Sequence, residues 1–481
     1  MHSDELALYV NLARYDAPRL VTGRLDASES TQAAPPLFLL AVDRLVPLGP
    51  PDVSDERRLR LLPALSSLLA LPACLWLALE TARRVRLPRW ALIALPLAGM
   101  AVGTNTLIQS SRMKQYGPEM LAGALLPAVW LSRRREGLPR GSARLAIDHL
   151  LLGAIAAMLA GFAYPAGLLY LSLLAIDTWL AIRARLSWAR VAALVPGAAL
   201  GIGSSALVYL VTARRQRDPF LSGYWKESML DLSRPWGWPL EVAQTFTEML
   251  RFDLPPLGLG LLVFIAAGGW WLWRRDRLLL AALSAGTVIT IAAATAGLYP
   301  FSASRLTLYL APALLVWAGV GLGWFASLPA APARVTGVAL AALIVLAGTW
   351  ETVHEYFWRE SRLRALGAWL SKNVEAKDAI ISPTLSLREH LSVYHPGLPE
   401  PLVWYRSHPV PPEVGQLAET TSAPRIWLAV GGDTAQDRQA LAEKALAALP
   451  TEVAQTARRV EVRGGLILEM RPGEMSRKPL P

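Results

Sequence analysis

The chain has 481 residues, of which 53% are hydrophobic and 18% are charged, with 18 Trp and a mean hydropathy of +0.33. Soluble domains usually carry about 25% charged residues, so this composition excludes an ordinary soluble protein. Several segments hold about 20 mostly apolar residues, which is the length needed to cross about 30 Å of hydrocarbon. The sequence therefore predicts a polytopic α-helical membrane protein.

The formal net charge of +11 is compatible with nucleic-acid binding through a basic patch. Much of the excess charge, however, lies in short loops between apolar segments, as Arg clusters at 83–89, 133–144, 183–190 and 274–277. Such clusters mark cytoplasmic loops, so no nucleic-acid partner is expected. The single cysteine, Cys74, cannot build a disulfide or a thiolate metal site alone, and the six His residues show no HExxH-type spacing.

Residues 1–58 hold no predicted span. Residues 4–14 have apolar side chains at helical spacing, and 37–48 is a short apolar run interrupted by charges, which favours a helix lying in the membrane interface. We expect this region to be the first outer loop, carrying the acidic pair Asp4 and Glu5. Because an outer loop needs a span to carry it there, a missing N-terminal transmembrane helix is one explanation for this start.

About ten spans are predicted within a transmembrane bundle of residues 59–358. They are 60–80, 90–107, 118–132, 148–163, 165–182, 191–211, 255–273, 278–298, 306–326 and 336–350. Tyr164 and Pro165 break one long apolar run into a tight hairpin. With the Arg clusters inside, both terminal regions lie on the outer face of the cell inner (plasma) membrane.

After residue 358 the composition changes. Strand-like runs at 379–382, 425–430 and 465–470 alternate with helical patterns at 363–374 and 433–449. This alternation predicts a small extracytoplasmic α/β domain over residues 359–473. The tail 474–481 is expected to be disordered.

Two groups of charged and aromatic residues lie at predicted outer helix ends. Arg112, Lys114 and Tyr116 precede one span, and Arg305 precedes another. One interpretation is side chains that extend to the membrane surface, with an interfacial Tyr. The other is a phosphate-binding set, because an Arg at the start of a helix gains nothing from the helix dipole. Likewise, Asp4 and Glu5 are either a helix cap with a solvated acid or a pair of reactive carboxylates.

The order of these elements resembles that of the GT-C-fold glycosyltransferases, specifically the bacterial relatives of protein O-mannosyltransferases and lipid A aminoarabinose transferases in glycosyltransferase family 39. That group has an Asp-Glu pair, a Pro-Pro stretch, an Arg before the next span, an Arg/Lys-x-Tyr element and a Tyr-Pro-Phe-x-x-x-Arg element. The matching stretches here are 3–6, 32–37, 59–63, 112–116 and 299–305.

The resemblance implies a GT-C-like bundle and transfer of a hexosyl or pentosyl group from a polyprenyl-phosphate-linked donor at the outer membrane face. It also implies that Asp4 is the catalytic carboxylate and Glu5 supports it. Arg112, Lys114, Tyr116 and Arg305 would then bind the donor phosphate. No cofactor is required with certainty, although Asp4 and Glu5 could share a divalent cation, Mg²⁺ or Mn²⁺, with that phosphate.

Two features depart from the family pattern. The span that normally precedes the Asp-Glu pair is absent from this sequence, and Gln32 stands where the aminoarabinose transferases have Lys. The remaining alternatives are a transporter or flippase of lipid-linked sugars, and a polymerase or ligase of surface polysaccharide. Charges within the predicted spans would favour transport, but the spans hold almost none. The acceptor, the sugar and the oligomeric state stay open.

Overall fold

The structure is a computed structural model with two compact units. The described residues are 3–25, 33–45, 55–110, 112–135, 137–139, 141–216, 225–230, 238–253, 258–302, 304–358, 362–383, 387, 390–391, 395, 397–403, 414, 423–431, 435–462 and 465–471. Residues 15–24 and 33–356 belong to a helical unit, and residues 1–14, 25–32 and 357–481 belong to a second unit. Gln32 and the predicted tail 474–481 lie outside the described residues.

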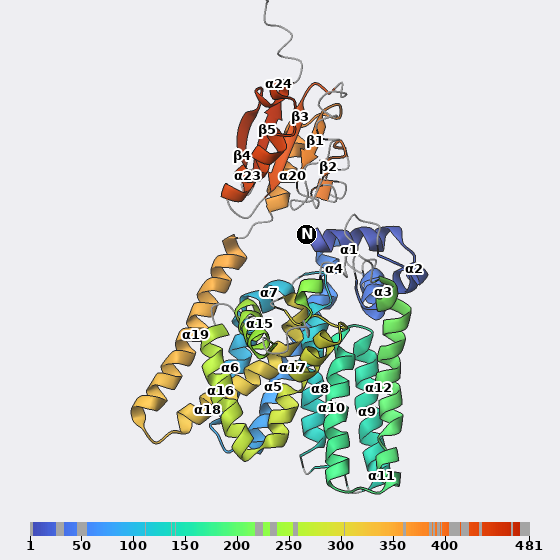
Figure 1. Ribbon diagram of the computed structural model, residues 1–481, viewed down its shortest axis with the longest axis vertical. Coiled ribbons are helices and arrows are strands. Elements are labelled where there is room, and N and C mark those ends of the chain that lie inside the picture. The colour runs from blue at the N-terminus through green and yellow to red at the C-terminus, as the bar shows by residue number, and fades with distance from the viewer. Residues whose placement is uncertain are drawn as a thin grey trace, which may run out of the picture. The chain divides into compact units, whose positions relative to one another are not determined.

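Long helices form the helical unit, called the bundle below (Figure 1). They are α5 (Leu61–Arg84), α6 (Arg89–Val102), α8 (Tyr116–Arg133), α9 (Ser142–Ala160), α10 (Pro165–Arg183), α12 (Val195–Val208), α16 (Gly258–Arg275), α17 (Arg277–Thr295), α18 (Ala311–Ser327) and α19 (Ala331–Trp358). Among the described residues, each predicted span therefore coincides largely with helix, although some spans are divided between two helices. Of the described residues, seven helical stretches are long and apolar enough to cross a membrane, and the predicted number of ten spans stays a prediction.

Further helices of the bundle lie before and between these. They are α2 (Ala17–Thr22), α3 (Pro36–Leu45), α4 (Asp55–Leu59), α7 (Thr104–Ser110), α11 (Trp188–Ala192), η2 (Tyr209–Ala213), α13 (Arg214–Gln216), η3 (Lys226–Ser228), α15 (Trp238–Asp253) and η4 (Arg305–Leu310). The end where α7 leads into α8 is called the α7 end, and the end where α10 leads into α11 is called the α11 end. The predicted span 90–107 is divided at Gly103 into α6 and α7.

The core of the bundle is built around α18. In its candidate span, 89% of the apolar stretch is buried, compared with 22–44% in the other candidate spans among the described residues. Helix α18 lies directly against α16, because a Cβ added at Gly321 would be 1.9 Å from the carbonyl oxygen of Phe264. A larger residue at this position would therefore push the two backbones apart.

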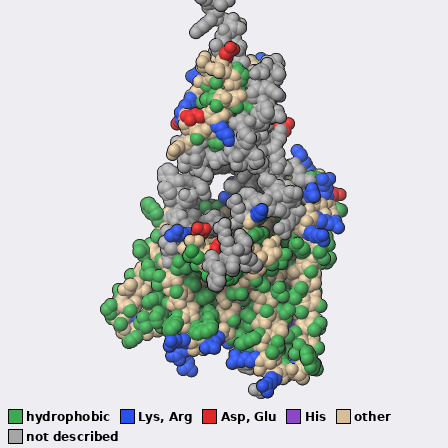
Figure 2. Space-filling view, in the orientation of Figure 1, with side chains coloured by type: hydrophobic (Ala, Val, Ile, Leu, Met, Phe, Trp, Pro, Cys, Tyr) green, Lys and Arg blue, Asp and Glu red, His purple; other side chains and the backbone are tan. Residues whose placement is uncertain are grey.

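The outer surface of the bundle is hydrophobic (Figure 2). Large apolar side chains on several helices are more than half exposed, among them Leu68, Val288 and Trp350. A continuous apolar surface of this kind is expected on helices that face lipid. Lys and Arg side chains gather at the lower end of the bundle in this view. The molecule is a membrane protein, as predicted.

The second unit contains a five-stranded sheet in the order β2-β1-β3-β5-β4. Its strands are β1 (Ala379–Ser382), β2 (Leu402–Val403), β3 (Ile426–Gly431), β4 (Arg458–Val462) and β5 (Gly465–Met470). β1 pairs in parallel with β2 and β3, whereas β5 pairs antiparallel with β3 and β4. The predicted α/β character and three predicted strands are confirmed, whereas the sequence interpretation missed β2 and β4.

Helices cover both faces of this sheet. Leu428 and Leu468 pack in a cluster with α23 (Ala435–Leu446), whereas Trp427 and Ile467 pack in a cluster with α20 (Arg362–Asn373). A short helix, α24 (Thr451–Ala454), precedes β4, and helix α1 (Ser3–Arg14) belongs to the same unit. Successive side chains of β3 and β5 point to opposite faces of the sheet, so each face carries its own apolar cluster.

Candidate functional site

The turn η4 is held against α8 at the α7 end of the bundle. A Cβ added at Gly123 would be 1.8 Å from the carbonyl oxygen of Tyr309, so only Gly allows the η4 backbone to approach this closely. The Tyr299 hydroxyl donates a hydrogen bond to the Leu306 carbonyl oxygen at 2.9 Å, and the Ser304 hydroxyl accepts one from the Leu306 amide at 3.4 Å. These contacts fix the start of η4, where Arg305 lies.

Arg305 and Tyr116 come together at the α7 end. The guanidinium carbon of Arg305 is 5.7 Å from the centroid of the Tyr116 ring, within the range of a cation–π interaction. Tyr116 is buried and begins α8, whereas Arg305 is partly exposed and begins η4. The structure thus brings together two residues that the sequence placed in one site although they are far apart in the chain.

Arg112 and Lys114 lie in the turn between α7 and α8. The Lys114 amide donates to the Arg112 carbonyl oxygen at 2.8 Å, and Arg112 Nη1 donates to Gln109 Oε1 at 3.3 Å. The Lys114 residue is 4% exposed, an environment in which Lys is rare unless it is paired. The turn therefore supplies two cations within four residues of Tyr116.

Glu119 is a buried acid that the sequence interpretation did not assign to the site. It lies one turn after Tyr116 on α8, is 1% exposed, and its Oε2 has no hydrogen-bond partner among the described residues. Burial, and to a lesser extent the nearby Glu119 carboxyl group, raises the pKa of Tyr299 and also that of Tyr164, which places Glu119 near both loops. The sequence signal that could have identified Glu119 is its position as an acid in the first turn of an otherwise apolar span.

Tyr164 connects three segments beside this acid. Its hydroxyl is 2.8 Å from the Ala34 carbonyl oxygen and 2.9 Å from Gln216 Oε1, which also accepts a hydrogen bond from the Ala34 amide at 3.0 Å. The Pro-Pro stretch that starts α3 is thereby tied to the α9–α10 hairpin and to α13. These bonds place a conformationally restricted segment at the α7 end.

The two predicted carboxylates lie on α1, in the second unit. Glu5 is 1% exposed, and the placement of the Asp4 side chain lies outside the described residues. The predicted convergence of Asp4 and Glu5 with Arg112, Lys114 and Arg305 stays a prediction. Among the described residues, no group of three His, Cys, Asp or Glu side chains could hold a metal ion.

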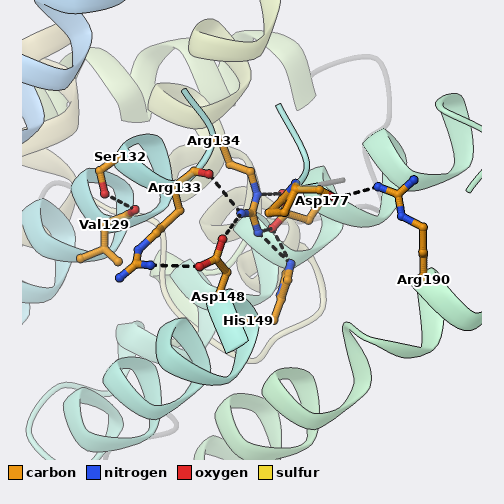
Figure 3. A network of polar contacts seen from close by, with 9 residues as sticks. Val129, Ser132, Arg133, Arg134, Asp148, His149, Asp177 and Arg190 are labelled. Atoms are coloured by element: carbon orange, nitrogen blue, oxygen red, sulfur yellow. Dashed lines mark hydrogen bonds and ion pairs between the residues drawn. The ribbon is translucent and has the colours of Figure 1, made fainter. Parts of the chain in front are cut away.

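The α11 end contains a buried network of charges (Figure 3). Arg134 Nε and Nη2 each lie 2.8 Å from a different carboxylate oxygen of Asp177, and His149 Nε2 is 2.9 Å from Arg134 Nη2 and 3.0 Å from Asp177 Oδ2. Arg133 Nη1 is 2.9 Å from Asp148 Oδ1. These pairs join the ends of α8, α9 and α10, and they give the Arg cluster at 133–135 a structural role.

Other arginines of the predicted cytoplasmic loops pair in the same way. Glu80 on α5 binds Arg83 and Arg135, and Arg84 Nε is 3.0 Å from Asp276 Oδ2 at the start of α17. The acids that pair with them were not singled out from the sequence, because each lies near the end of an apolar helix rather than in its middle.

The fold is similar to that of membrane glycosyltransferases. ArnT from Cupriavidus metallidurans bound to undecaprenyl phosphate has a TM-score of 0.52 at 13% identity over 100% of this chain and 95% of that chain. The apo form of ArnT gives 0.51 at 12% identity over 99% and 94% of the two chains. The oligosaccharyltransferase from Archaeoglobus fulgidus in the apo form gives 0.53 at 11% identity over 93% of this chain and 68% of that chain.

At these identities the similarity shows the fold. The chain has the GT-C fold that the sequence predicted, with a membrane bundle and a small C-terminal sheet. No protein-family model and no curated protein matches the chain in sequence.

Proposed function

We propose that this protein is a membrane glycosyltransferase that moves a sugar from a polyprenyl-phosphate donor to a lipid, glycan or protein acceptor. The observation that supports it most is the pairing of Arg305 with Tyr116 beside the cationic 112–114 turn, within a fold similar over its whole length to ArnT. The ArnT structure contains undecaprenyl phosphate. The reaction would take place at the outer face of the cell inner membrane.

The reaction needs a nucleophile and a stabilised leaving group. The acceptor oxygen or nitrogen attacks the anomeric carbon, a new bond forms there, and the bond between that carbon and the phosphate oxygen breaks. The acceptor proton passes to the Asp4 carboxylate, supported by Glu5, and polyprenyl phosphate leaves with the bonding electrons. General-base assistance of this type contributes about 10²–10⁴-fold.

The cations stabilise the phosphate as negative charge develops on it. Arg and Lys bind phosphate oxygens at about 2.7–2.9 Å through charge-assisted hydrogen bonds. Arg305 is held over the Tyr116 ring, and its backbone is fixed by Tyr299 and Ser304, so little reorganisation is needed when the charge appears. We assign Arg305, Lys114 and Arg112 to the phosphate, with Tyr116 positioning Arg305.

Glu119 adds a second candidate carboxylate. Its carboxyl group is buried one turn after Tyr116 on α8, and its Oε2 has no hydrogen-bond partner among the described residues. In the same proposal, Asp4 and Glu5 could share a divalent cation, Mg²⁺ or Mn²⁺, with the donor phosphate. Activity that survives prolonged chelation would show that the cationic side chains suffice without a metal.

The test is transfer of a radiolabelled sugar from a polyprenyl-phosphate donor in proteoliposomes. Asp4→Asn is expected to lower the rate by about 100-fold or more, because the side-chain amide of Asn cannot accept the acceptor's proton. Asp16→Asn, which changes an exposed acid at the N-terminus of α2, is the matched control and should keep the wild-type rate. Full activity in Asp4→Asn would remove the proposed mechanism.

A flippase of lipid-linked sugars is the second candidate, favoured by the buried acid Glu119 within the bundle. A flippase would move a fluorescent lipid-linked sugar between the leaflets of vesicles, and Asp4→Asn would leave that movement unchanged. Absence of such movement in vesicles that support sugar transfer would exclude this candidate.

A further inference from the structure

A pocket opens at the α11 end of the bundle, away from the candidate site. It has a volume of about 320 Å³ and is lined by Leu138, Leu180, Ala184, Leu186 and Arg190. These residues come from the turn after α8, the end of α10 and the short helix α11. Four of the lining residues are apolar and one is a cation, so the pocket suits a ligand that has both an apolar part and a negative charge.

Arg190 carries the polar part of this pocket. Its Nη2 donates to the Pro139 carbonyl oxygen at 2.7 Å, which anchors the side chain to the turn after α8 (Figure 3). Its Nε is buried and has no hydrogen-bond partner among the described residues. Because the Arg190 side chain lines the pocket and carries a positive charge, a negatively charged ligand oxygen in the pocket would be favourable.

Aromatic residues mark the α11 end as the level of the lipid headgroups. Arg183 lies 5.3 Å from the ring centroid of Trp179, and Arg274 lies 4.0 Å from that of Trp270. Trp188, two residues before Arg190, is 87% exposed. Exposed Trp beside Arg is typical of the membrane–water interface. The pocket therefore opens where phospholipid headgroups lie.

The backbone turns sharply to form one wall of the pocket. Arg185 has a φ of +49°, and the Leu186 amide donates to the Ala181 carbonyl oxygen at 3.1 Å. After this reversal, Leu186 packs against the same small apolar cluster as Leu138, which includes Ala181 of α10. The result is an apolar wall beside the Arg190 guanidinium.

We propose that this pocket binds one anionic phospholipid, with the headgroup phosphate on Arg190 and the first part of an acyl chain against Leu138, Leu180 and Leu186. The neighbouring arginines Arg133 and Arg134 are engaged by Asp148 and Asp177, which leaves Arg190 as the cation that lines the pocket. Basic pockets between helix ends at a membrane surface are suited to lipid phosphate groups. The site is independent of sugar transfer.

The test is native mass spectrometry of the detergent-solubilised protein titrated with phosphatidylglycerol and, separately, with phosphatidylcholine. The wild-type protein is expected to bind the first phosphatidylglycerol more tightly than phosphatidylcholine. Arg190→Gln should weaken that binding by about fivefold or more, because one cation near the headgroup contributes about that factor. Arg274→Gln, which removes an exposed arginine at the same end, should leave it unchanged.

A second variant separates the pocket from the folding of α11. Ala184→Leu fills the pocket from an exposed position and keeps Arg190, so it should also abolish the first tight binding. Equal binding in Ala184→Leu and wild type, or equal affinity for the two lipids, would overturn the proposal. Complete displacement of the lipid by millimolar glycerol 3-phosphate would also overturn it, because the ligand would then be a soluble phosphate.

Discussion

At the scale of single residues, the sequence predicted the cations better than the acids. Arg305 and Tyr116 were placed in one site and are in contact. Glu119 was overlooked because one acid in an apolar span gives no pattern, and its importance depends on burial, which only the packed structure reveals. The roles of Asp4 and Glu5 rest on resemblance and stay predictions.

Arg305→Met and Lys114→Met should each weaken donor binding more than they weaken folding. A hydrogen bond to a charged group contributes about 1.5–3 kcal/mol, which corresponds to roughly 10- to 100-fold in the donor dissociation constant. Binding of a polyprenyl-phosphate donor would be measured by scintillation proximity, beside the melting temperature of each variant. Arg274→Met, which also removes an Arg from an aromatic ring, is the control.

If the Arg305 and Lys114 variants fail to accumulate while Arg274→Met accumulates normally, their role is structural. The same holds if their melting temperatures fall in proportion to the loss of binding.

His395 should make the second unit sensitive to acid. Burial lowers the pKa of His395, and its ring lies 5.9 Å from that of His390. Between the lowered folded pKa and the unfolded value of about 6.5, the unfolded chain binds more protons, so stability falls as the pH falls through this range. His395→Gln should reduce this loss, as measured by amide exchange of β1 and β3 in both proteins at matched pH values.

An equal loss of protection in the variant and the wild type below pH 6.5 would assign the acid sensitivity to other groups of the second unit.

At the scale of elements, helices and buried strands were predictable because apolar runs and their breaks determine them. Tyr164 and Pro165 do separate α9 from α10. The short strands β2 and β4 were not recognised, because two residues of β2 give no period, and β4 is an edge strand in which three of the five residues are charged and exposed. The approach of η4 to α8 was also unpredictable, since it depends on a single Gly that meets a distant carbonyl group.

Gly123→Ala should therefore disturb the candidate site through the backbone. The new methyl group would collide with the Tyr309 carbonyl oxygen, and overpacking of this kind costs about 1–3 kcal/mol. We expect a lower melting temperature and weaker donor binding, because Arg305 moves with η4. Gly203→Ala on α12, where nothing lies within 4 Å of the added Cβ, is the control and should be neutral or slightly stabilising.

Unchanged donor binding in Gly123→Ala, despite a measurable loss of stability, would show that the position of η4 does not control the cations.

At the scale of the whole molecule, composition and the pattern of apolar runs were enough to predict a membrane bundle with a separate α/β unit, and the fold agrees. The membrane orientation follows only from the Arg clusters, and several of those arginines are paired with buried or partly buried acids at the α11 end. These arginines are explained by their ion pairs as well as by the positive-inside rule. The orientation of the protein in the membrane is therefore measured directly, as follows.

The buried single cysteine makes this measurement simple. In a Cys74→Ala background, Lys377→Cys lies at an exposed site of the second unit, and Ser187→Cys lies at an exposed site of the α11 end. A membrane-impermeant maleimide should label Lys377→Cys in intact spheroplasts and Ser187→Cys only after permeabilisation. The reverse pattern would place the second unit in the cytoplasm and exclude transfer at the outer face.

The Arg134 network also constrains the order in which the chain can be assembled. Arg134 emerges from the ribosome 43 residues before Asp177, its main counter-ion. Until α10 has entered the bilayer, the guanidinium must stay hydrated at the membrane surface, because an uncompensated charge is costly in hydrocarbon. Helices α9 and α10 should consequently dock onto α8 as a preformed hairpin, and translation arrested between residues 134 and 177 should yield an intermediate that proteases readily degrade.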